Sequence, residues 1–317
     1  MIIMLYILYM EKIDDNYDLV IVGGGCAGYP AAIYAARFNL KTLVIAKEKG
    51  GLITTTHLVE NYPGFISLTG QELADNLEAH VKANNVTILN DIVSGIVKKD
   101  NGTFVVSTDL EELEINAKAV VLATGTKHKH LGAPGEKEFM HRGVSYCATC
   151  DGPFYKKKIV GIVGGGDSSA KEAMVLAQNC EKVYMFVRST LKAEPINQKR
   201  IRALDNVEII EGVTIDEVCG DDSGVTHVKL NDGKQIDMVG LFVAIGHDAQ
   251  SSLGKSLGTD VNSRDEIIID KLSCTNVPGV FAAGDVTDLP WKQGITGAAE
   301  GSLAGYSAFE YISKKFE

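Results

Sequence analysis

Two segments far apart in the chain share one pattern of apolar and polar positions. In each, a short apolar run ends in three consecutive glycines, and the two runs are Tyr17–Gly25 and Lys158–Gly166. A helix-like segment and a second apolar run follow each of them, at 31–37 and 42–46 in the first case and at 170–177 and 183–187 in the second. Strand, glycine turn, helix and strand form a βαβ unit, so the pattern predicts two dinucleotide-binding domains with parallel sheets.

Two further apolar runs that end in glycine, Ala119–Gly125 and Val239–Gly246, flank the second unit. We interpret them as hinges. The second domain is then an insertion of roughly residues 127–247 in a first domain made of 1–126 and 248–317. Alternating runs such as 103–107 predict antiparallel ribbons packed on the parallel sheets. The predicted fold class is α/β, with two Rossmann-like domains, the second inserted into the first.

Composition supports a globular protein of two domains. A chain of 317 residues exceeds the size at which one hydrophobic core keeps growing. The net charge of −10 argues against a nucleic-acid partner, because such proteins carry an excess of lysine and arginine. Six cysteines are too few for a disulfide scaffold, which favours a reducing, cytoplasmic location. They are Cys26, Cys147, Cys150, Cys180, Cys219 and Cys274.

The first ten residues are apolar, but they are too few to span a bilayer and lack the features of a signal peptide. We therefore expect no membrane partner. The simplest interpretation is a loose extension over residues 1–12, with Met10 as an alternative natural start.

The first glycine motif is Gly23-x-Gly25-x-x-Gly28, and it lies between a predicted strand and a predicted helix. In such a motif the first glycine makes a tight turn, the second admits a pyrophosphate, and the third lets the helix pack on the strand. An acid at the end of the next strand normally binds the adenosine ribose. Here that strand ends in Ala46-Lys47, so Glu48 is the candidate.

The second glycine motif runs from Gly164 to Ser168, and we place Ala170 at its third glycine position, where alanine is an accepted variant. Arg188 and Lys192 follow the next predicted strand, where a 2′-phosphate of NADPH would lie. For Arg188 or Lys192 taken singly, an alternative is that the residue belongs to a basic surface exposed to solvent.

Cys147-x-x-Cys150 is the one pair of cysteines close in sequence. It predicts either half of a zinc site, with His128 and His130 as further ligands, or a redox dithiol. The other cysteines are scattered singly, so a redox pair is favoured and no metal is expected. Asp151 follows directly and is placed either to manage a thiol proton or to cap a helix.

Near the C-terminus, a turn and a buried strand end in Gly284-Asp285, and a helix rich in small residues opens after Lys292-Gln293. The aspartate is suited to a hydroxyl of a flavin's ribityl chain and, taken alone, equally to a turn. The helix N-terminus is suited to an anionic ring edge.

Together these motifs resemble the low-molecular-weight thioredoxin reductases, over nearly the whole chain after Asp18. The most specific stretches are 48–52 with 60–64, 147–151, 164–168, 242–247 and 283–286. The resemblance implies a homodimeric, NADPH-dependent thioredoxin-disulfide reductase. It implies that FAD contacts Gly23, Gly25, Cys26, Ala27, Gly28, Glu48, Gly51, Leu52, Asn61, Thr124, Gly125, Gly284, Asp285, Lys292 and Gln293. It implies that NADPH contacts Gly164, Gly165, Gly166, Asp167, Ser168, Arg188 and Lys192.

The resemblance also implies a division of roles at the dithiol. Cys150 would face the flavin, Cys147 would attack the disulfide of thioredoxin, and Asp151 would carry the proton. Because NADPH and the dithiol lie on one domain, that domain would rotate between two positions.

Two departures from the family pattern leave alternatives open. Cys26 stands where proline or alanine is usual and is expected to be a small buried residue. Val187 and Ser189 flank Arg188 where the NADPH signature has histidine and arginine. The alternatives are a reductase with another electron donor, a flavin-dependent dithiol oxidase, and a non-catalytic redox sensor or zinc scaffold. The intact second glycine motif argues against the oxidase.

Overall fold

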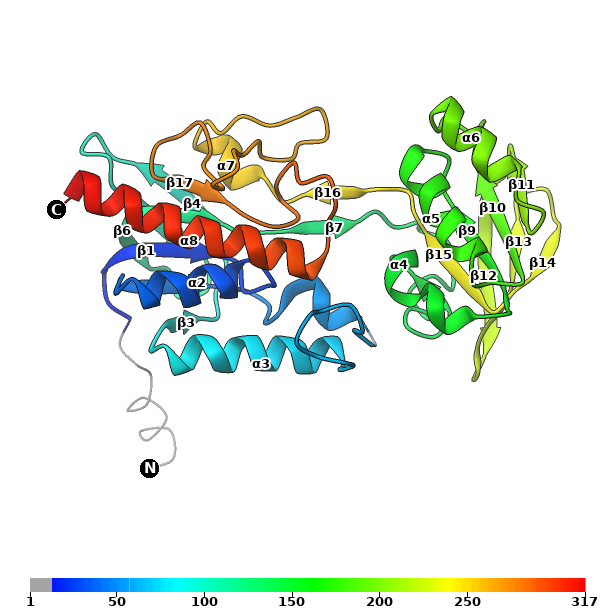
Figure 1. The fold of residues 1–317 in the computed structure, drawn as a ribbon, viewed down its shortest axis with the longest axis horizontal. Coiled ribbons are helices and arrows are strands. Elements are labelled where there is room, and N and C mark those ends of the chain that lie inside the picture. Colours follow the sequence, from blue (N-terminus) through cyan, green and yellow to red (C-terminus); the bar gives the residue numbers. More distant parts are fainter. Residues whose placement is uncertain (1–12, 57, 317) are drawn as a thin grey trace.

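The computed structural model describes residues 13–56 and 58–316, so the predicted extension at 1–12 lies outside the described residues. The chain forms two lobes (Figure 1). The first lobe contains a seven-stranded sheet in the order β3-β2-β1-β6-β5-β4, with β17 paired to β6. Its strands are β1 Asn16–Val22, β2 Thr42–Ile45, β3 Thr87–Leu89, β4 Val93–Lys98, β5 Phe104–Thr108, β6 Glu114–Leu122 and β17 Val280–Ala282. The helices are α2 Gly28–Arg37, η1 Gly51–Thr55, α3 Gly70–Ala83, α7 Ser252–Ser256 and α8 Gly294–Phe316.

The second lobe contains a five-stranded parallel sheet in the order β11-β10-β9-β15-β8, together with an antiparallel ribbon of three strands. The sheet strands are β8 Val144–Ser145, β9 Ile159–Val163, β10 Lys182–Val187, β11 Val207–Glu211 and β15 Gly240–Val243. The ribbon strands are β12 Ile215–Asp221, β13 Gly224–Leu230 and β14 Gln235–Asp237. The helices are α4 Ala148–Asp151, η2 Gly152–Tyr155, α5 Asp167–Ala177 and α6 Pro195–Arg202.

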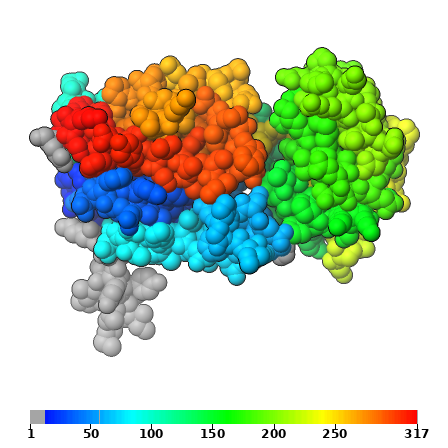
Figure 2. All heavy atoms as spheres, in the orientation of Figure 1, coloured from blue at the N-terminus to red at the C-terminus, as the bar shows by residue number. Residues whose placement is uncertain are grey.

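The lobes are joined by two antiparallel strands, β7 (Thr126–His128) and β16 (His247–Ala249), which cross between them side by side (Figure 1). The space-filling view shows the second lobe, in green, as a separate body of atoms beside the first (Figure 2). The Thr124 hydroxyl donates to the Gln250 carbonyl at 2.7 Å, which ties the two strands together where they leave the first lobe. We propose residues 127–247 as the inserted domain on this arrangement.

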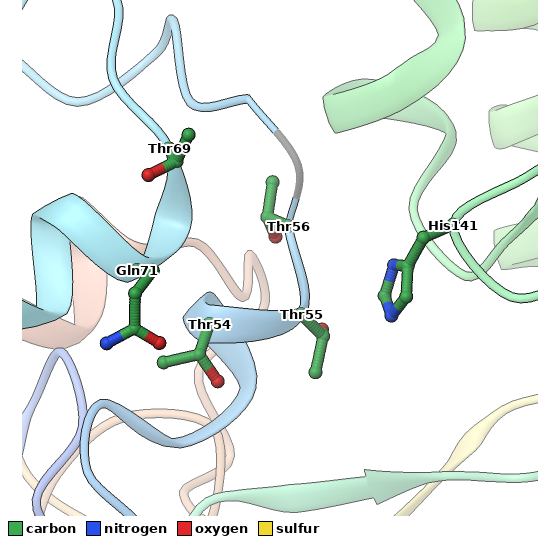
Figure 3. A pocket seen from close by; sticks show the side chains of 6 residues that line it. All are labelled: Thr54, Thr55, Thr56, Thr69, Gln71 and His141. Carbon is green, nitrogen blue, oxygen red and sulfur yellow. The ribbon is translucent and has the colours of Figure 1, made fainter.

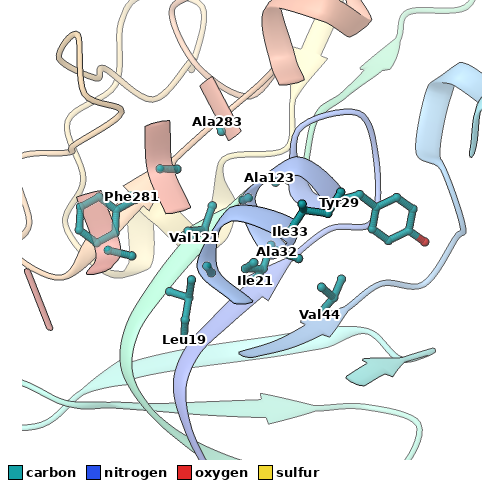
Figure 4. Packing of buried hydrophobic residues seen from close by; sticks show 14 of the residues in the cluster. Leu19, Ile21, Tyr29, Ala32, Ile33, Val44, Val121, Ala123, Phe281 and Ala283 are labelled. Carbon is teal, nitrogen blue, oxygen red and sulfur yellow. The ribbon is translucent and has the colours of Figure 1, made fainter. Parts of the chain in front are cut away.

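One core of the first lobe is formed by side chains of β1, β6 and β17 packed with those of α2 and α8 (Figure 4). Leu19, Ile21, Val121 and Phe281 are at most 4% exposed there. Helix α8 packs closely on α2, because a side-chain carbon at Gly301 would lie only 2.0 Å from the Ala27 carbonyl oxygen. This close packing brings the start of α8 to the first glycine loop.

The predicted α/β class, both βαβ units and the antiparallel ribbons are confirmed. Helix α2 begins at Gly28, three residues before the predicted segment, because the glycine turn leads directly into the first helical turn. In the two described ranges, no helix is both long and apolar enough to cross a bilayer.

Candidate active site

The first glycine loop is shaped by its own backbone at two positions. Gly23 has φ of 116°, and an added Cβ there would lie 2.1 Å from the Ala123 carbonyl oxygen. A Cβ at Gly28 would lie 1.8 Å from the Gly23 carbonyl oxygen. Real side-chain carbons do not approach backbone so closely, so both glycines are required by the fold itself.

Gly25 is different, because a Cβ there would meet only the Gly50 carbonyl oxygen at 3.4 Å. The fold leaves room at this position, which fits the close approach of a dinucleotide pyrophosphate to the backbone. The loop that contains Glu48 lies alongside, since the Gly50 amide donates to the Gly24 carbonyl at 2.8 Å. Glu48 itself is exposed just beyond β2, the place expected for a ribose contact.

The segment after β17 is held to helix α8 by a buried acid that the sequence motifs did not reveal. Glu300 accepts hydrogen bonds from the Gly284 amide at 2.8 Å and the Thr287 hydroxyl at 3.1 Å. Burial raises the pKa of Glu300. The pKa of Asp285 is also raised by burial, against the opposing effects of Lys292 and His247. The sequence did carry one signal of this contact, because Glu300 is the single charged residue in the run of small and apolar residues from 294 to 305.

Three of the predicted cofactor residues, Lys292, Asn61 and Gln293, also make hydrogen bonds within the protein. The Lys292 ammonium donates to the carbonyls of Asp285 at 2.8 Å and Thr287 at 2.7 Å, so it closes the loop that carries the aspartate. The Asn61 amide donates to the Gln293 side chain at 3.1 Å. The structure thus brings together two predicted residues that are 232 positions apart in the sequence.

Cys26 lies in the first glycine loop and is half-buried, where the sequence predicted a small buried residue. Its pKa is raised to about 12, chiefly by desolvation and then by the charge of Asp285. The thiol is therefore protonated at neutral pH, which makes it a poor nucleophile.

The second glycine loop has the same geometry, and it corrects one assignment. Gly164 follows β9 with φ of 147°, and a Cβ there would lie 2.4 Å from the Ala244 carbonyl oxygen. Gly164 is therefore the counterpart of Gly23. The third glycine position is then Ser169, five residues on, and the placement of Ala170 at this position is wrong. The Ser169 side chain is buried, and its hydroxyl donates to the Gly166 carbonyl at 2.8 Å.

Gly166 lies beside open space. A Cβ added to it would have no neighbouring atom within 4 Å, so neither packing nor a left-handed backbone explains this glycine. A phosphate group that approaches the backbone at this position would explain it. Asp167 begins α5, and its carboxylate accepts from the Asn197 amide at 2.7 Å and pairs with Lys171 at 2.7 Å. These contacts lower the pKa of Asp167 to about 2, and the contact with Lys171 has the largest effect.

Arg188 and Lys192 follow β10. Arg188 is exposed, and the backbone of Lys192 is bonded to the second glycine loop. The Lys192 amide donates to the Gly165 carbonyl at 2.7 Å, which fixes the segment that carries both cations beside that loop. The structure therefore holds these cations at the edge of the proposed nucleotide site.

Cys147 and Cys150 form a disulfide, with Cα atoms 5.3 Å apart. Helix α4 starts directly after Cys147, on the side of the second lobe that faces the first (Figure 1). The Cys150 amide donates to the Cys147 sulfur at 3.2 Å. Such a donor stabilises a thiolate, so reduction of the disulfide would leave Cys147 with a stabilised anionic form.

Asp151 is the last residue of α4, and the sequence predicted it either as a proton carrier or as a helix cap. No side-chain cap bond joins it to η2, the helical turn that follows. Instead, its carboxylate accepts a hydrogen bond of 2.6 Å from the Ser145 hydroxyl. The side chain is thus directed to Ser145 at the end of β8.

The histidines considered as zinc ligands, His128 and His130, lie at the end of β7 and just after it, where β7 crosses between the lobes. His128 stacks on Tyr146 with ring centroids 4.9 Å apart and lies 4.6 Å from the ring of His247. Burial, followed by the effects of His247 and His130, lowers the pKa of His128 to about 4. Among the residues that the structure describes, no group of three or more histidine, cysteine or acidic side chains could hold a metal ion.

A pocket opens between the lobes (Figure 3). Threonines 54–56, Thr69 and Gln71 line it from the first lobe and His141 from the second. Several of these hydroxyls are already bonded within the chain, as in the Thr54 and Thr55 contacts to the carbonyls of Gly51 and Leu52. We assign no chemistry to this pocket.

Comparison with known families identifies the chain. The model of the pyridine nucleotide-disulphide oxidoreductases matches residues 17–305. The chain belongs to this family. Membership implies FAD and a pyridine nucleotide as cofactors, which agrees with the room left at Gly25 and the open space at Gly166.

This oxidoreductase is similar to thioredoxin reductases and to a subunit of alkyl hydroperoxide reductase. The crystal structure of thioredoxin reductase from Streptococcus pyogenes is 36% identical, with a TM-score of 0.89 over 95% of this chain and 100% of that one. Thioredoxin reductase from T. acidophilum is also 36% identical, with a TM-score of 0.64 over 94% of this chain and 99% of that one. The F subunit of alkyl hydroperoxide reductase from Staphylococcus aureus is 37% identical over 94% of this chain. The chain spans only 59% of that relative's length.

The open space at Gly166 leads to a prediction for this oxidoreductase. We expect Gly166→Ala to fold normally and to bind nicotinamide nucleotide about tenfold more weakly, a loss of about 1.4 kcal/mol. Gly95→Ala is the matched control, because its Cβ would also enter open space, on β4 of the other lobe. Titration of nucleotide fluorescence measures both. Equal affinities in the two variants would contradict a phosphate site at Gly166.

Proposed function

We propose that this oxidoreductase is an NADPH-dependent thioredoxin-disulfide reductase. The observation that carries the proposal is the Cys147–Cys150 disulfide, flanked by the Asp151 carboxylate, on the lobe that also carries the second glycine loop. The likeness to two thioredoxin reductases over nearly the whole of each chain supports it. The partner is then a thioredoxin-like protein with an accessible disulfide.

The residues around the two glycine loops fit the two cofactors. FAD would be held by the loop of Gly25, by Glu48, and by the Asp285 and Gln293 segments, and NADPH by the loop of Gly166. When bound, these groups supply two electrons for reduction of a disulfide.

The remaining steps belong to the chain's own residues. The Cys147 thiolate attacks one sulfur of the partner disulfide, so a mixed disulfide forms and the partner's second sulfur leaves as a thiolate. The Cys150 thiolate then attacks Cys147, which restores the Cys147–Cys150 disulfide and releases the reduced partner. Asp151 takes the thiol proton and gives it to the leaving sulfur. The amide donor at the Cys147 sulfur favours Cys147 as the attacking residue.

Two strands alone join the lobes in the described part of the chain, and this supports a change in their relative position during turnover. The TM-scores give further support, since two relatives with the same 36% identity superpose so differently, at 0.89 and 0.64. Equal sequence similarity with unequal whole-chain superposition is expected when the same two lobes adopt different arrangements.

The relationship to an alkyl hydroperoxide reductase favours a second candidate partner. This is a different protein disulfide, served by the same dithiol. A direct comparison separates the two: thioredoxin and the disulfide of a peroxide-reducing partner are each supplied as the only acceptor. Faster turnover with thioredoxin would support the leading proposal.

The first experiment is an anaerobic titration of the flavin-loaded protein with NADPH and, separately, with NADH, followed by the visible flavin absorbance. Bleaching by about one equivalent of NADPH supports the proposed donor. Bleaching by neither nucleotide, while dithiothreitol still reduces the flavin through the dithiol, would reject NADPH. It would favour another donor or an oxidase.

Arg188 provides a test of nucleotide choice. We expect Arg188→Ala to weaken NADPH binding by about tenfold or more, because a charge-assisted bond to the 2′-phosphate is lost. Binding of NADH, which lacks that phosphate, should stay unchanged. Arg142→Ala removes an exposed arginine that lies over Phe139 on the same lobe, and it serves as the control. An equal loss for NADPH and NADH would contradict a 2′-phosphate contact.

The proposal includes a homodimer. The outer side of α2 and α8 exposes Tyr34 at 45%, Leu303 at 37% and Tyr306 at 41%, and a second copy would cover these side chains. Sedimentation velocity of the flavin-loaded protein tests this, and a monomer at every concentration would reject it.

A further inference from the structure

A buried serine, Ser145, links the first cysteine of the dithiol to Asp151, the acid that directly follows the second cysteine. Ser145 is on β8, where it pairs with Phe242 of β15, and it is only 5% exposed. Its hydroxyl donates to the Asp151 carboxylate at 2.6 Å. The same hydroxyl oxygen accepts from the Cys147 amide at 3.1 Å. One hydroxyl therefore contacts both the backbone of the attacking cysteine and the carboxylate.

The two contacts fix which way the hydroxyl acts. A serine hydroxyl has a single proton to donate, and the Cys147 amide can only donate to it. The hydroxyl proton is therefore available to Asp151, and the short distance is typical of a bond to a charged carboxylate. A donor of this kind favours the charged form of the acid and restricts rotation of its side chain.

The backbone around the serine is itself fixed. β8 is held in the parallel sheet by β15, and the cap residue of α4, Cys147, comes two residues after Ser145. The serine is thus held by the sheet, whereas the dithiol and its acid lie on the helical turns that follow. A rigid strand that directs a side chain on a short turn is a suitable support for proton transfer.

We propose that Ser145 is a positioning residue, which holds the Asp151 carboxylate in place to exchange a proton with the dithiol. This rests on the proposed function of Asp151. In the exchange, the S–H bond of Cys147 breaks and its proton goes to the carboxylate. The sulfur forms a bond to one sulfur of the partner disulfide, and the other partner sulfur leaves and takes the proton. The proton and electron pair are thus accounted for without a further reactant.

A purely structural role for Ser145 makes a different prediction. Loss of the hydroxyl would then lower stability or slow the reaction by the same factor at every pH. If Ser145 acts through Asp151, its loss moves the titration of that carboxylate, because the charged form loses a donor and its pKa rises. The pH profile therefore separates the two roles.

The test uses the flavin-loaded protein, with its dithiol reduced. The rate of iodoacetamide alkylation of Cys147 is measured across pH in wild type, Ser145→Ala, Ser145→Thr and Asp151→Asn. The inflection that Asp151→Asn removes is assigned to the carboxylate. We expect Ser145→Ala to move this inflection to higher pH by about one unit, and Ser145→Thr, which keeps the hydroxyl, to leave it in place.

Ser307→Ala is the matched control. Ser307 is 6% exposed in the first lobe and donates to the Leu272 carbonyl at 2.7 Å, so its loss removes an equally buried hydroxyl without touching the dithiol. Disulfide reduction should slow by about tenfold in Ser145→Ala and about a hundredfold in Asp151→Asn, and should stay unchanged in Ser307→Ala.

Two results would overturn the inference. One is an unmoved inflection in Ser145→Ala with a uniform loss of rate. The other is an inflection that survives Asp151→Asn. Alkylation needs no thioredoxin, so a wild-type protein that shows the Asp151-dependent inflection but fails to reduce thioredoxin would reject the proposed partner and leave the role of Ser145 intact.

Discussion

Replacing Cys150 with serine is expected to lower the rate of disulfide reduction by about three orders of magnitude or more, while flavin reduction by the nicotinamide nucleotide continues. The reason is the division of labour at the dithiol. Without the Cys150 sulfur, the Cys147–Cys150 disulfide cannot form, so the mixed disulfide with the partner has no internal thiol to resolve it. The nucleotide loop of Gly166 is unaffected by this change.

The experiment has two readouts on one protein. Stopped-flow absorbance follows flavin reduction by the nucleotide, and a coupled assay follows thioredoxin reduction. Cys219→Ser is the matched control, because Cys219 is a half-buried free cysteine on β12 of the same lobe. Full activity is expected in the control. Loss of flavin reduction in Cys150→Ser would contradict the proposed order of electron flow.

The second large effect is expected in the first glycine loop, where Gly28→Ala and Gly25→Ala should fail for different reasons. The Cβ of Gly28→Ala would lie 1.8 Å from the Gly23 carbonyl oxygen, so the loop or α2 must move. We expect a loss of about 3 kcal/mol or more in the free energy of unfolding, at the upper end of overpacking costs. Flavin content should fall with it.

Gly25→Ala provides the contrast. Its Cβ would meet only one carbonyl oxygen at an ordinary 3.4 Å, so the flavin-free protein should keep its free energy of unfolding within about 0.5 kcal/mol. Flavin content should nevertheless fall, because the methyl group occupies the space that the pyrophosphate needs. Urea unfolding of the flavin-free proteins and flavin absorbance after purification measure the two effects. A stable Gly28→Ala variant, or a Gly25→Ala variant that retains its flavin, would contradict this explanation of the motif.

The parts of the protein that depend on local physics could be predicted from the residues alone. The two glycine motifs could be predicted because a turn with positive φ or a close approach of backbone allows only glycine. The strands and helices around them could be predicted because apolar residues repeat with a strand or helix period. Cys147 and Cys150 could be predicted as a redox pair because they are close in sequence while the other cysteines are scattered.

Contacts between distant segments were decided only by the tertiary structure. Glu300 binds the Gly284 amide because α8 packs on α2 and turns that carboxylate towards β17. Asn61 meets Gln293 because its segment lies against the start of α8, where a Cβ at Gly294 would lie 3.6 Å from the Tyr62 ring. No local pattern contains these contacts, since they depend on how closely two helices approach and on which face each one presents.

The structure also showed how the second glycine motif aligns with the first and which group the Asp151 carboxylate contacts, and the local sequence pattern leaves both open. Gly164 lies against the end of β15, and this contact, not the letters of the motif, places Ser169 at the third glycine position. The Asp151 carboxylate could bind a helix end or a nearby hydroxyl, and the strand that carries Ser145 decides for the hydroxyl. Sequence specified which residues were available for chemistry, and the packing of the sheets and helices determined which of them meet.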